Sequence, residues 1–258
     1  MNGIVNLSGK KGLIVGIANK DSIAYGIAQK VKAAGATLAV THLNAKAESY
    51  VKPLADEVGA EIFMPCDILV DGQLEAVFAK ITEQWGTLDF VVHSIAYAPL
   101  ADLHGRVVDC SLEGFSHAMN VSCHSFARMA KLAEPLMKDG GTLVNLSYYG
   151  AEKVIPNYNM MGPVKAALEC MTRYIAYELA EKRIRAVSIS PGPIRTRAAG
   201  GIKDFDQLVN MAANKVPHYA EMGQEDIGDL AAFLVSDAAR FLNGYTYYVD
   251  NGLSLVGA

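Results

Sequence analysis

The sequence has few cysteines and few charged residues, and both shortages narrow the class of protein that it can encode. Only four cysteines occur among 258 residues, and no two of them have Cys-x-x-Cys spacing. Such wide spacing is typical of reduced, buried thiols rather than disulfides or a zinc site, so we expect a cytoplasmic protein. Charged residues make up 19% of the chain and hydrophobic residues 51%. This balance suits a sheet buried on both faces and further burial in an oligomer.

Long apolar runs, a basic surplus and metal-ligand spacings are also missing. No apolar run reaches the roughly 18 residues that a membrane-spanning helix needs, and the first residues lack the apolar core of a signal peptide. The net charge of -4 argues against a nucleic-acid binder. The six histidines lack His-x-x-x-His spacing, so we interpret them as structural and expect no metal site. Repeats and linkers are absent too, which predicts a single domain over residues 1–258.

Short apolar runs alternate with helical patterns along the chain. We expect strands at 12–16, 37–41, 61–65, 88–93, 141–146, 185–189 and 245–249, and helices at 22–34, 71–85, 112–138, 164–182 and 224–242. This alternation predicts an α/β fold, a single-domain Rossmann-like doubly wound parallel sheet of about seven strands with helices on both faces. Residues 191–217 are expected to be irregular or weakly helical. Ligands of such sheets bind at the carboxyl ends of the strands, near the switch in strand order.

The first predicted strand leads into a turn that can hold a dinucleotide, although the Gly-x-Gly-x-x-Gly pattern is absent. Gly16 and Gly26 frame the turn, and a helix opens near Ser22. Free backbone N–H groups at a helix N-terminus favour pyrophosphate, and the serine hydroxyl adds a donor. An ordinary turn with Asp21 or Ser22 as helix cap explains the same residues equally well.

The ends of the next strands supply further candidate cofactor contacts. Around Leu43 there is neither the acidic residue typical of NAD sites nor the arginine that marks a 2′-phosphate. Lys46 is the nearest cation, which leaves a preference for NADH. Asp67 can accept a hydrogen bond from the adenine amino group, or it can be a plain turn residue. The small residues Ser94 and Ala96, on either side of Ile95, can let backbone approach a cofactor, or this segment simply ends a strand.

A tyrosine and a lysine seven positions apart, Tyr158 and Lys165, carry the clearest chemical signal. Two helical turns take about 7.2 residues, so on a helix the pair shares one face with about 10 Å of rise between them. A lysine ammonium stabilises a phenolate and eases proton donation, and its three donors can bind ribose hydroxyls. Pro163 is tolerated in the first turn of a helix, so Tyr158 can instead lie at the helix entrance. The alternative is that the Tyr158 ring only packs in the interior and that Lys165 is an ordinary surface residue.

The segment after the sixth predicted strand is a candidate lid. Pro191 and Pro193 stop the strand, backbone around Ile194 can pair with a carboxamide, and Thr196 can reach a phosphate. Small residues then combine with an apolar edge, which suits a mobile lid over an apolar substrate at about 193–217. A flexible surface loop is the alternative.

Together these segments resemble the bacterial NADH-dependent enoyl-acyl-carrier-protein reductases, a divergent family of short-chain dehydrogenases. The matching motifs, in the order of the family, are Ser22-Ile-Ala-Tyr-Gly-Ile-Ala-Gln29, His93-Ser-Ile95, Leu146-Ser-Tyr148, Ile155-Pro-Asn-Tyr-Asn159 with Lys165, and Gly192-Pro-Ile-Arg-Thr196 with Gly201-Ile-Lys-Asp-Phe205. Ordinary short-chain dehydrogenases place tyrosine and lysine four apart, and here Gly162 stands where their lysine would be.

The resemblance implies a homotetramer that uses NADH to reduce the trans-2,3 double bond of a fatty enoyl thioester on acyl carrier protein. It implies that Tyr158 hydrogen-bonds the thioester oxygen, that Lys165 holds the nicotinamide ribose, and that Tyr148 lines the site near the thioester. The implied cofactor contacts are Gly16, Ser22, Ile23, Leu43, Asp67, Ile68, Ser94, Ile95, Lys165, Ile194 and Thr196. The implied substrate contacts are Ala96, Tyr148, Tyr158, Met161, Ala198, Ile202 and Phe205.

One departure from the family pattern concerns the carrier protein. Asp206 and Gln207 stand where the family often has basic residues that face the acidic carrier, so we expect weakened or altered carrier recognition. Two other functions stay open: a related reductase acting on another enoyl or keto substrate, and a non-catalytic NAD(H)-binding sensor. Keto reduction usually needs the lysine four residues after the tyrosine, and a sensor need not keep Tyr158 and Lys165.

Overall fold

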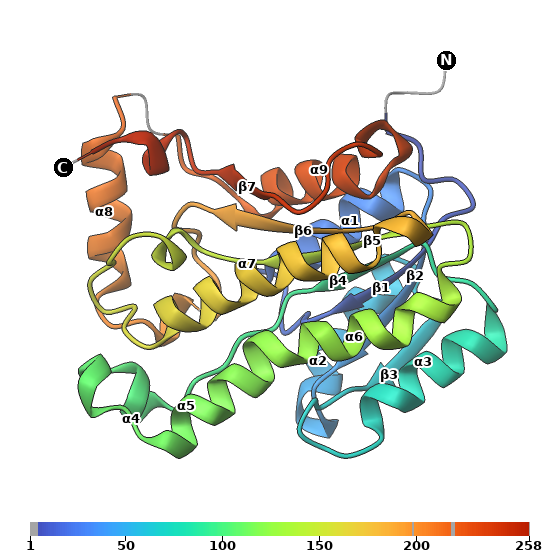
Figure 1. The fold of residues 1–258 in the computed structure, drawn as a ribbon, viewed down its shortest axis with the longest axis horizontal. Coiled ribbons are helices and arrows are strands. Elements are labelled where there is room, and N and C mark those ends of the chain that lie inside the picture. The colour runs from blue at the N-terminus through green and yellow to red at the C-terminus, as the bar shows by residue number, and fades with distance from the viewer. Residues whose placement is uncertain (1–4, 198, 218–219, 258) are drawn as a thin grey trace.

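The protein is built on one parallel seven-stranded sheet with helices on both faces (Figure 1). The computed structural model describes residues 5–197, 199–217 and 220–257. The strands are β1 (Lys11–Val15), β2 (Thr37–His42), β3 (Ile62–Pro65), β4 (Phe90–His93), β5 (Gly141–Leu146), β6 (Ile184–Pro191) and β7 (Thr246–Val249). Their order in the sheet, β3-β2-β1-β4-β5-β6-β7, confirms the predicted doubly wound Rossmann-like fold.

The helices agree with the sequence prediction in part. They are α1 (Ile23–Ala33), α2 (Ala45–Glu57), α3 (Gln73–Gln84), α4 (Leu100–Leu103), α5 (Leu112–Met119), α6 (Ser125–Ala133), α7 (Met161–Glu178), α8 (Phe205–Lys215) and α9 (Gln224–Val235). The predicted long helical segment over roughly 112–138 is confirmed as a continuous run, in which a π-helical turn at Asn120–His124 joins α5 to α6 and a 3-10 turn follows at Glu134–Leu136. Within the described ranges, no helix combines the length and apolar character needed to cross a bilayer.

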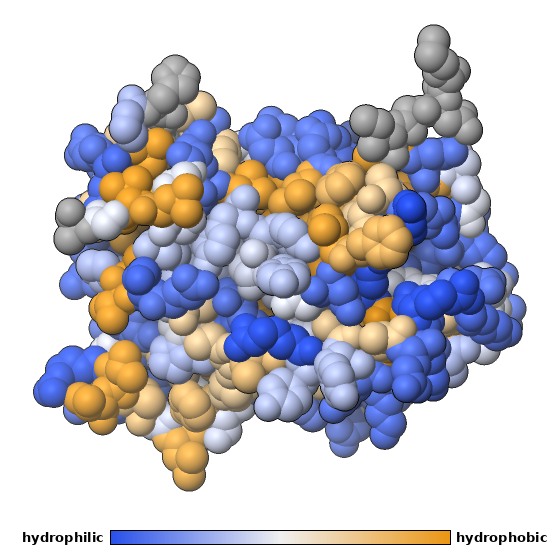
Figure 2. All heavy atoms as spheres, turned by 45° about the horizontal axis from the view of Figure 1, so that its top comes forward, coloured by the Kyte–Doolittle hydropathy of each residue, from blue (hydrophilic) through white to orange (hydrophobic). Residues whose placement is uncertain are grey.

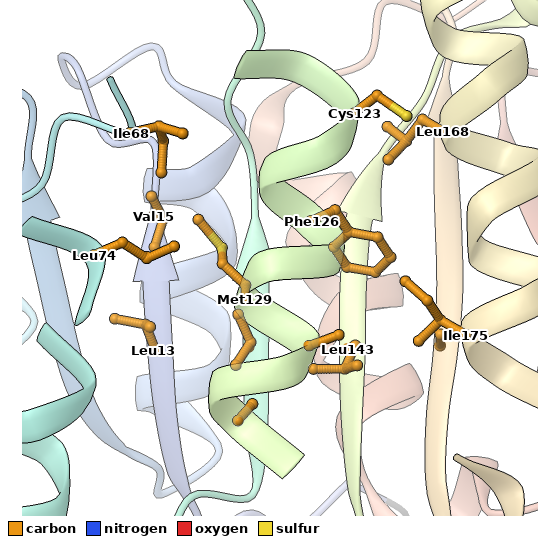
Figure 3. Packing of buried hydrophobic residues seen from close by; sticks show 14 of the residues in the cluster. Leu13, Val15, Ile68, Leu74, Cys123, Phe126, Met129, Leu143, Leu168 and Ile175 are labelled. Atoms are coloured by element: carbon orange, nitrogen blue, oxygen red, sulfur yellow. The ribbon is translucent and has the colours of Figure 1, made fainter. Parts of the chain in front are cut away.

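The two faces of the sheet bury separate cores, because alternate residues of a strand point to opposite faces. Leu13 of β1 belongs to the core under α3, α6 and α7, whereas its neighbour Ile14 belongs to the core under α1 and α9. Figure 3 shows Met129 and Phe126 of α6 in the first core, with Leu143 of β5 close to them. Burial on both faces explains the near-continuous apolar strands in the sequence.

Helices α1 and α9 cross at two glycines with no room for side chains. A Cβ on Gly228 would lie 2.5 Å from the backbone oxygen of Gly26, and a Cβ on Gly26 would lie 2.4 Å from the backbone oxygen of Gln224. A backbone oxygen cannot move away from such a Cβ unless the whole helix shifts. The glycines therefore let these helices approach each other, and α1 is the helix that follows the candidate cofactor turn.

We predict that Gly228→Ala lowers the free energy of unfolding by about 1–3 kcal/mol, because overpacking outweighs the better helix propensity of alanine. Urea unfolding followed by circular dichroism measures the change. Gly257→Ala is the matched control, since a Cβ there meets nothing within 4 Å. Equal unfolding midpoints for Gly228→Ala and the unaltered protein would contradict this account of the crossing.

Candidate active site

The switch in strand order lies between β1 and β4, where doubly wound sheets bind ligands. Gly16 follows β1 with a φ of +119°, and a Cβ there would lie 2.0 Å from the backbone oxygen of Ser94, which follows β4. Both the left-handed backbone and the close approach require glycine. The ends of the two strands are thereby held together at the edge that carries the predicted cofactor contacts.

The turn between Gly16 and α1 is shaped by the Ser22 hydroxyl. This oxygen accepts hydrogen bonds from the backbone N–H groups of Ala18 and Asn19, both at 3.0 Å. Ser22 stands at the N-cap position of α1 but does not cap the helix with its side chain. The first amides of α1, including that of Ile23, lie outside the hydrogen-bond ladder of the helix and can face an anion. The turn therefore fits a pyrophosphate through its backbone, with the serine in a supporting role.

The predicted adenine end follows β2 and β3. Leu43 is 53% exposed, so it can cover a ligand on the surface. One carboxylate oxygen of Asp67 accepts from the backbone N–H of Leu69 at 3.0 Å. Asp67 therefore stabilises the turn after β3, as the alternative interpretation of this residue expects. The backbone oxygen of the buried Ile68 accepts from the Arg128 guanidinium at 3.0 Å. The described contacts thus fix this turn firmly and place its residues at the same sheet edge as Gly16.

The remaining predicted cofactor contacts follow β4 and β6. Ile95 is partly buried, and Ile194 is buried shortly after β6, which ends at Pro191. The Thr196 hydroxyl accepts from the backbone N–H of Ala199 at 3.1 Å, so it caps the 3-10 turn Ala199–Gly201 while its own proton stays available. Parallel strands bring all these chain segments to one edge of the sheet.

Tyr158 lies just before α7, in a turn. The helix begins at Met161, and Pro163 falls in its first turn, where proline is tolerated. The expectation that Tyr158 and Lys165 share a helix face is therefore wrong, and the alternative, a tyrosine at the helix entrance, is confirmed. The ring of Tyr158 meets that of Tyr148 edge to face, with 4.8 Å between centroids, and only 7% of Tyr158 is exposed.

Burial controls the acidity of both tyrosines. It raises the pKa of Tyr158, and the neighbouring Tyr148 and Glu169 raise it further. Burial also raises the pKa of Tyr148 to about 12. The expectation that Lys165 makes Tyr158 easier to deprotonate is thus not met. A phenol with a raised pKa stays neutral at ordinary pH and acts as a hydrogen-bond donor.

Lys165 is buried on α7 and reaches the end of β5, where its Nζ donates to the backbone oxygen of Leu146 at 2.6 Å. Burial lowers its pKa to about 8, and Cys123 and Glu169 oppose that shift. Glu169 lies one turn further along α7 and accepts a short hydrogen bond from the Ser147 hydroxyl. Sequence reasoning missed Glu169. Its position four residues after Lys165, on the same helix face, was the available signal.

The candidate substrate residues are brought together only in part. Met161 and Ile202 pack in the same apolar cluster as the two tyrosines. Phe205 opens α8 and is partly buried, Ala96 is exposed, and Ala198 lies outside the described residues. Figure 2 shows hydrophobic surface at the end of the molecule where α4 and α8 lie. Among the described residues, no group of three or more His, Cys, Asp or Glu side chains could hold a metal ion.

Comparison with known proteins decides the family. A protein-family model described as enoyl-(acyl carrier protein) reductase matches residues 16–254. The chain belongs to this family. An enoyl-[acyl-carrier-protein] reductase [NADH] of Rickettsia typhi is 43% identical over 252 residues, which cover 98% of this chain and 97% of the relative. The resemblance seen in the sequence motifs is thereby confirmed.

Solved structures of family members agree with the fold. The enoyl-acyl-carrier-protein reductase of Anaplasma phagocytophilum in complex with NAD is 44% identical with a TM-score of 0.94, over 98% of this chain and 96% of that chain. The reductase of Bacillus cereus with NADP+ and indole naphthyridinone is 40% identical with a TM-score of 0.94, over 98% of this chain and 99% of that chain. Members of this reductase family have thus been seen with either nucleotide.

Proposed function

We propose that this chain reduces the trans-2,3 double bond of a fatty enoyl thioester, carried by acyl carrier protein, with NADH as the hydride donor. The arrangement of Tyr158 and Lys165 carries the proposal: a neutral, buried phenol precedes the helix on which a buried lysine reaches the sheet edge. The names of the relatives and the NAD found with the Anaplasma protein support the same reaction.

Tyr158 acts on the substrate oxygen in this proposal. Hydride addition at C3 sends negative charge to the thioester oxygen, and a positioned donor stabilises that charge. The raised pKa of Tyr158 keeps its proton in place for this role. Tyr148 packs against the ring and lines the site beside the thioester, while Met161 and Ile202 form part of an apolar wall for the acyl chain.

The described residues fit NADH, which supplies the hydride when bound. The amides at the start of α1 fit the pyrophosphate, and Gly16 lets the turn that leads to them pack against the backbone of Ser94. Lys165 uses one donor on the backbone oxygen of Leu146, which leaves two for the hydroxyls of the nicotinamide ribose. Asp67 is the proposed adenine contact, and Ile194 the proposed carboxamide contact.

We further propose a homotetramer in the cytoplasm. Large aromatic side chains are exposed on α7 and near β7, and such surface is typical of subunit contacts. They are Tyr174 at 66%, Tyr177 at 85%, Phe241 at 85% and Tyr245 at 70% exposure. Cys66, Cys110, Cys123 and Cys170 are all free thiols, which supports a reducing compartment.

The reaction is tested by NADH absorbance with a short trans-2-enoyl-CoA, in parallel with a β-ketoacyl-CoA and with NADPH in place of NADH. We expect NADH oxidation with the enoyl thioester alone. Oxidation only with the ketone would instead indicate a keto reductase. NADH fluorescence quenching without any turnover would favour the sensor.

We predict that the lid of this chain binds acyl carrier protein weakly. Asp206 on α8 forms a short ion pair with Arg195, and Glu221 lies 3.8 Å from the same guanidinium. The charge that an acidic carrier would meet is therefore partly neutralised on this side of the site. An Asp206→Lys, Gln207→Lys variant should bind carrier severalfold more tightly at low salt and lose the advantage at high salt.

The matched control for carrier binding places the same charge change at the opposite edge of the sheet. Asp139→Lys with Gln84→Lys adds three positive charges, as the lid variant does, before β5 and at the end of α3. We expect this control to bind carrier like the unaltered protein. Lid and control variants with equal carrier affinity would contradict a local role for Asp206 and Gln207.

A further inference from the structure

The backbone around Tyr158 adopts a conformation that few residues tolerate. The asparagines on either side of it, Asn157 and Asn159, have φ angles of 66° and 46°. Asparagine populates this left-handed region more readily than other residues with a Cβ. Because these two residues flank Tyr158, the chain turns sharply on both sides of it, and this turn sets the direction of the Tyr158 ring.

Asn159 is also anchored by its side chain. Its amide Nδ2 donates to the backbone oxygen of Leu103, the last residue of α4, at 2.6 Å. That short helix is itself held in place: Asp102 accepts from the backbone N–H of Ser111 at 2.6 Å. His104 directly follows α4, and its Nε2 lies 2.8 Å from the backbone oxygen of Gly201. The tyrosine turn is thus tied to a segment fixed from two sides.

The ring of Tyr158 lies against a glycine. Gly150 is in the 3-10 turn Tyr149–Ala151, and a Cβ on it would lie 2.4 Å from Cδ1 and 2.8 Å from Cε1 of the ring. The φ of Gly150 is not in the left-handed region, so this position requires space rather than an unusual backbone. Tyr148 contacts the same ring edge to face. Any side chain at residue 150 would force the Tyr158 ring to move.

We propose that Gly150 and Asn159 are positioning residues for Tyr158: Gly150 supplies the space beside the ring, and Asn159 fixes the turn that carries it. The proposal rests on the proposed function, in which the Tyr158 hydroxyl binds the thioester oxygen. Displacing a reacting or stabilising group by about 1 Å can cost about 100-fold in rate. Neither residue is among the proposed substrate contacts, so both act through the direction of the phenol.

Gly150→Ala should lower kcat for enoyl thioester reduction by about 100-fold and leave the Kd for NADH within about twofold. NADH fluorescence titration and the thermal midpoint show that the variant is folded and binds cofactor. Gly257→Ala, where a Cβ meets nothing within 4 Å, is the control and should keep full turnover. A folded Gly150→Ala protein with unchanged kcat would overturn the role of Gly150.

A double variant separates positioning from a merely structural role. If Gly150 acts through the phenol, Gly150→Ala added to Tyr158→Phe should lower kcat by no more than about twofold beyond Tyr158→Phe alone, because residues that work as one unit are not additive. A second full loss in the double variant would overturn the proposal.

Two substitutions at Asn159 test the turn, even if Gly150→Ala does not fold. Asn159→Gly keeps the left-handed backbone and loses the bond to Leu103, whereas Asn159→Ala loses both. We expect kcat to fall in the order unaltered protein, Gly variant, Ala variant, with the Ala variant down at least about tenfold. Unaltered kcat in Asn159→Ala would overturn the role of Asn159. Lack of turnover in the unaltered protein would instead refute the proposed function.

Discussion

Tyr158→Phe should lower kcat for enoyl thioester reduction by about 100-fold, the usual cost of losing one donor to a developing oxyanion. The ring stays, so its contact with Tyr148 and its burial are preserved. The lost group is a neutral hydroxyl whose pKa is raised, so the effect comes from a missing hydrogen bond rather than a missing proton transfer at ordinary pH. The Kd for NADH should not change. Steady-state kinetics and NADH fluorescence titration measure the two quantities.

Tyr149→Phe is the matched control for Tyr158→Phe. It removes a hydroxyl from the residue next to Tyr148, and this hydroxyl donates to the backbone oxygen of Ser254 at 3.4 Å rather than to Tyr158 or Lys165. We expect its kcat to stay within about twofold of the unaltered enzyme, because this half-buried hydroxyl is not a proposed substrate or cofactor contact. Equal kcat in both variants and the unaltered enzyme would remove Tyr158 from the chemistry.

The strands and the longer amphipathic helices could be predicted from the sequence, because both faces of the sheet bury apolar side chains. Helix α2 shows the limit of such reading. It buries only Val51 and Ala55 among its residues and contains Pro53, so its apolar stripe is thin. Its start is set by Asn44, whose side chain accepts from the backbone N–H of Ala47 at 3.1 Å. A helix whose start is marked only by an N-cap residue, without a strong apolar periodicity behind it, is easily missed in a sequence.

The π-helical turn between α5 and α6 depends on contacts that the sequence does not show. The Ser125 hydroxyl donates to the backbone oxygen of Val121 at 2.7 Å, inside the turn. His93 from β4 lies 2.7 Å from the same hydroxyl through its Nε2, and burial lowers the pKa of His93 to about 3. A neutral histidine that supports a turn agrees with the structural interpretation of the histidines.

The site was predictable as a set of motifs but not as a geometry. Motif order predicted the candidate cofactor residues after the ends of the strands, with Tyr158 before α7 and Lys165 on it. Helical spacing misled, because Tyr158 precedes α7 and its direction comes from Asn157 and Asn159 in left-handed conformations. Burial, which raises the pKa of the tyrosine, depends on packing between separate elements such as the Tyr149–Ala151 turn and α7. Tertiary contacts of this kind leave no local signal.

Lys165→Met should raise the Kd for NADH by about 10- to 100-fold, since hydrogen bonds from a charged donor are worth about 1.5–3 kcal/mol. Methionine keeps the length and the apolar stem of the side chain. It cannot donate to Leu146 or to a ribose hydroxyl. Lys182→Met is the control, because Lys182 pairs with Glu134 at the surface. Unaltered NADH affinity in Lys165→Met would show that this lysine does not hold the cofactor.

The pH dependence gives Lys165 a second signature. Burial lowers its pKa to about 8, so the ammonium is present below that pH and lost above it. NADH affinity should therefore fall as pH rises through about 8, where an exposed lysine would hold its proton up to about 10.4. Glu169 raises the pKa of Lys165, so Glu169→Gln should move this fall to lower pH. In Lys165→Met this loss of NADH affinity with rising pH should disappear. If the variant still showed it, another group would be responsible for the pH dependence.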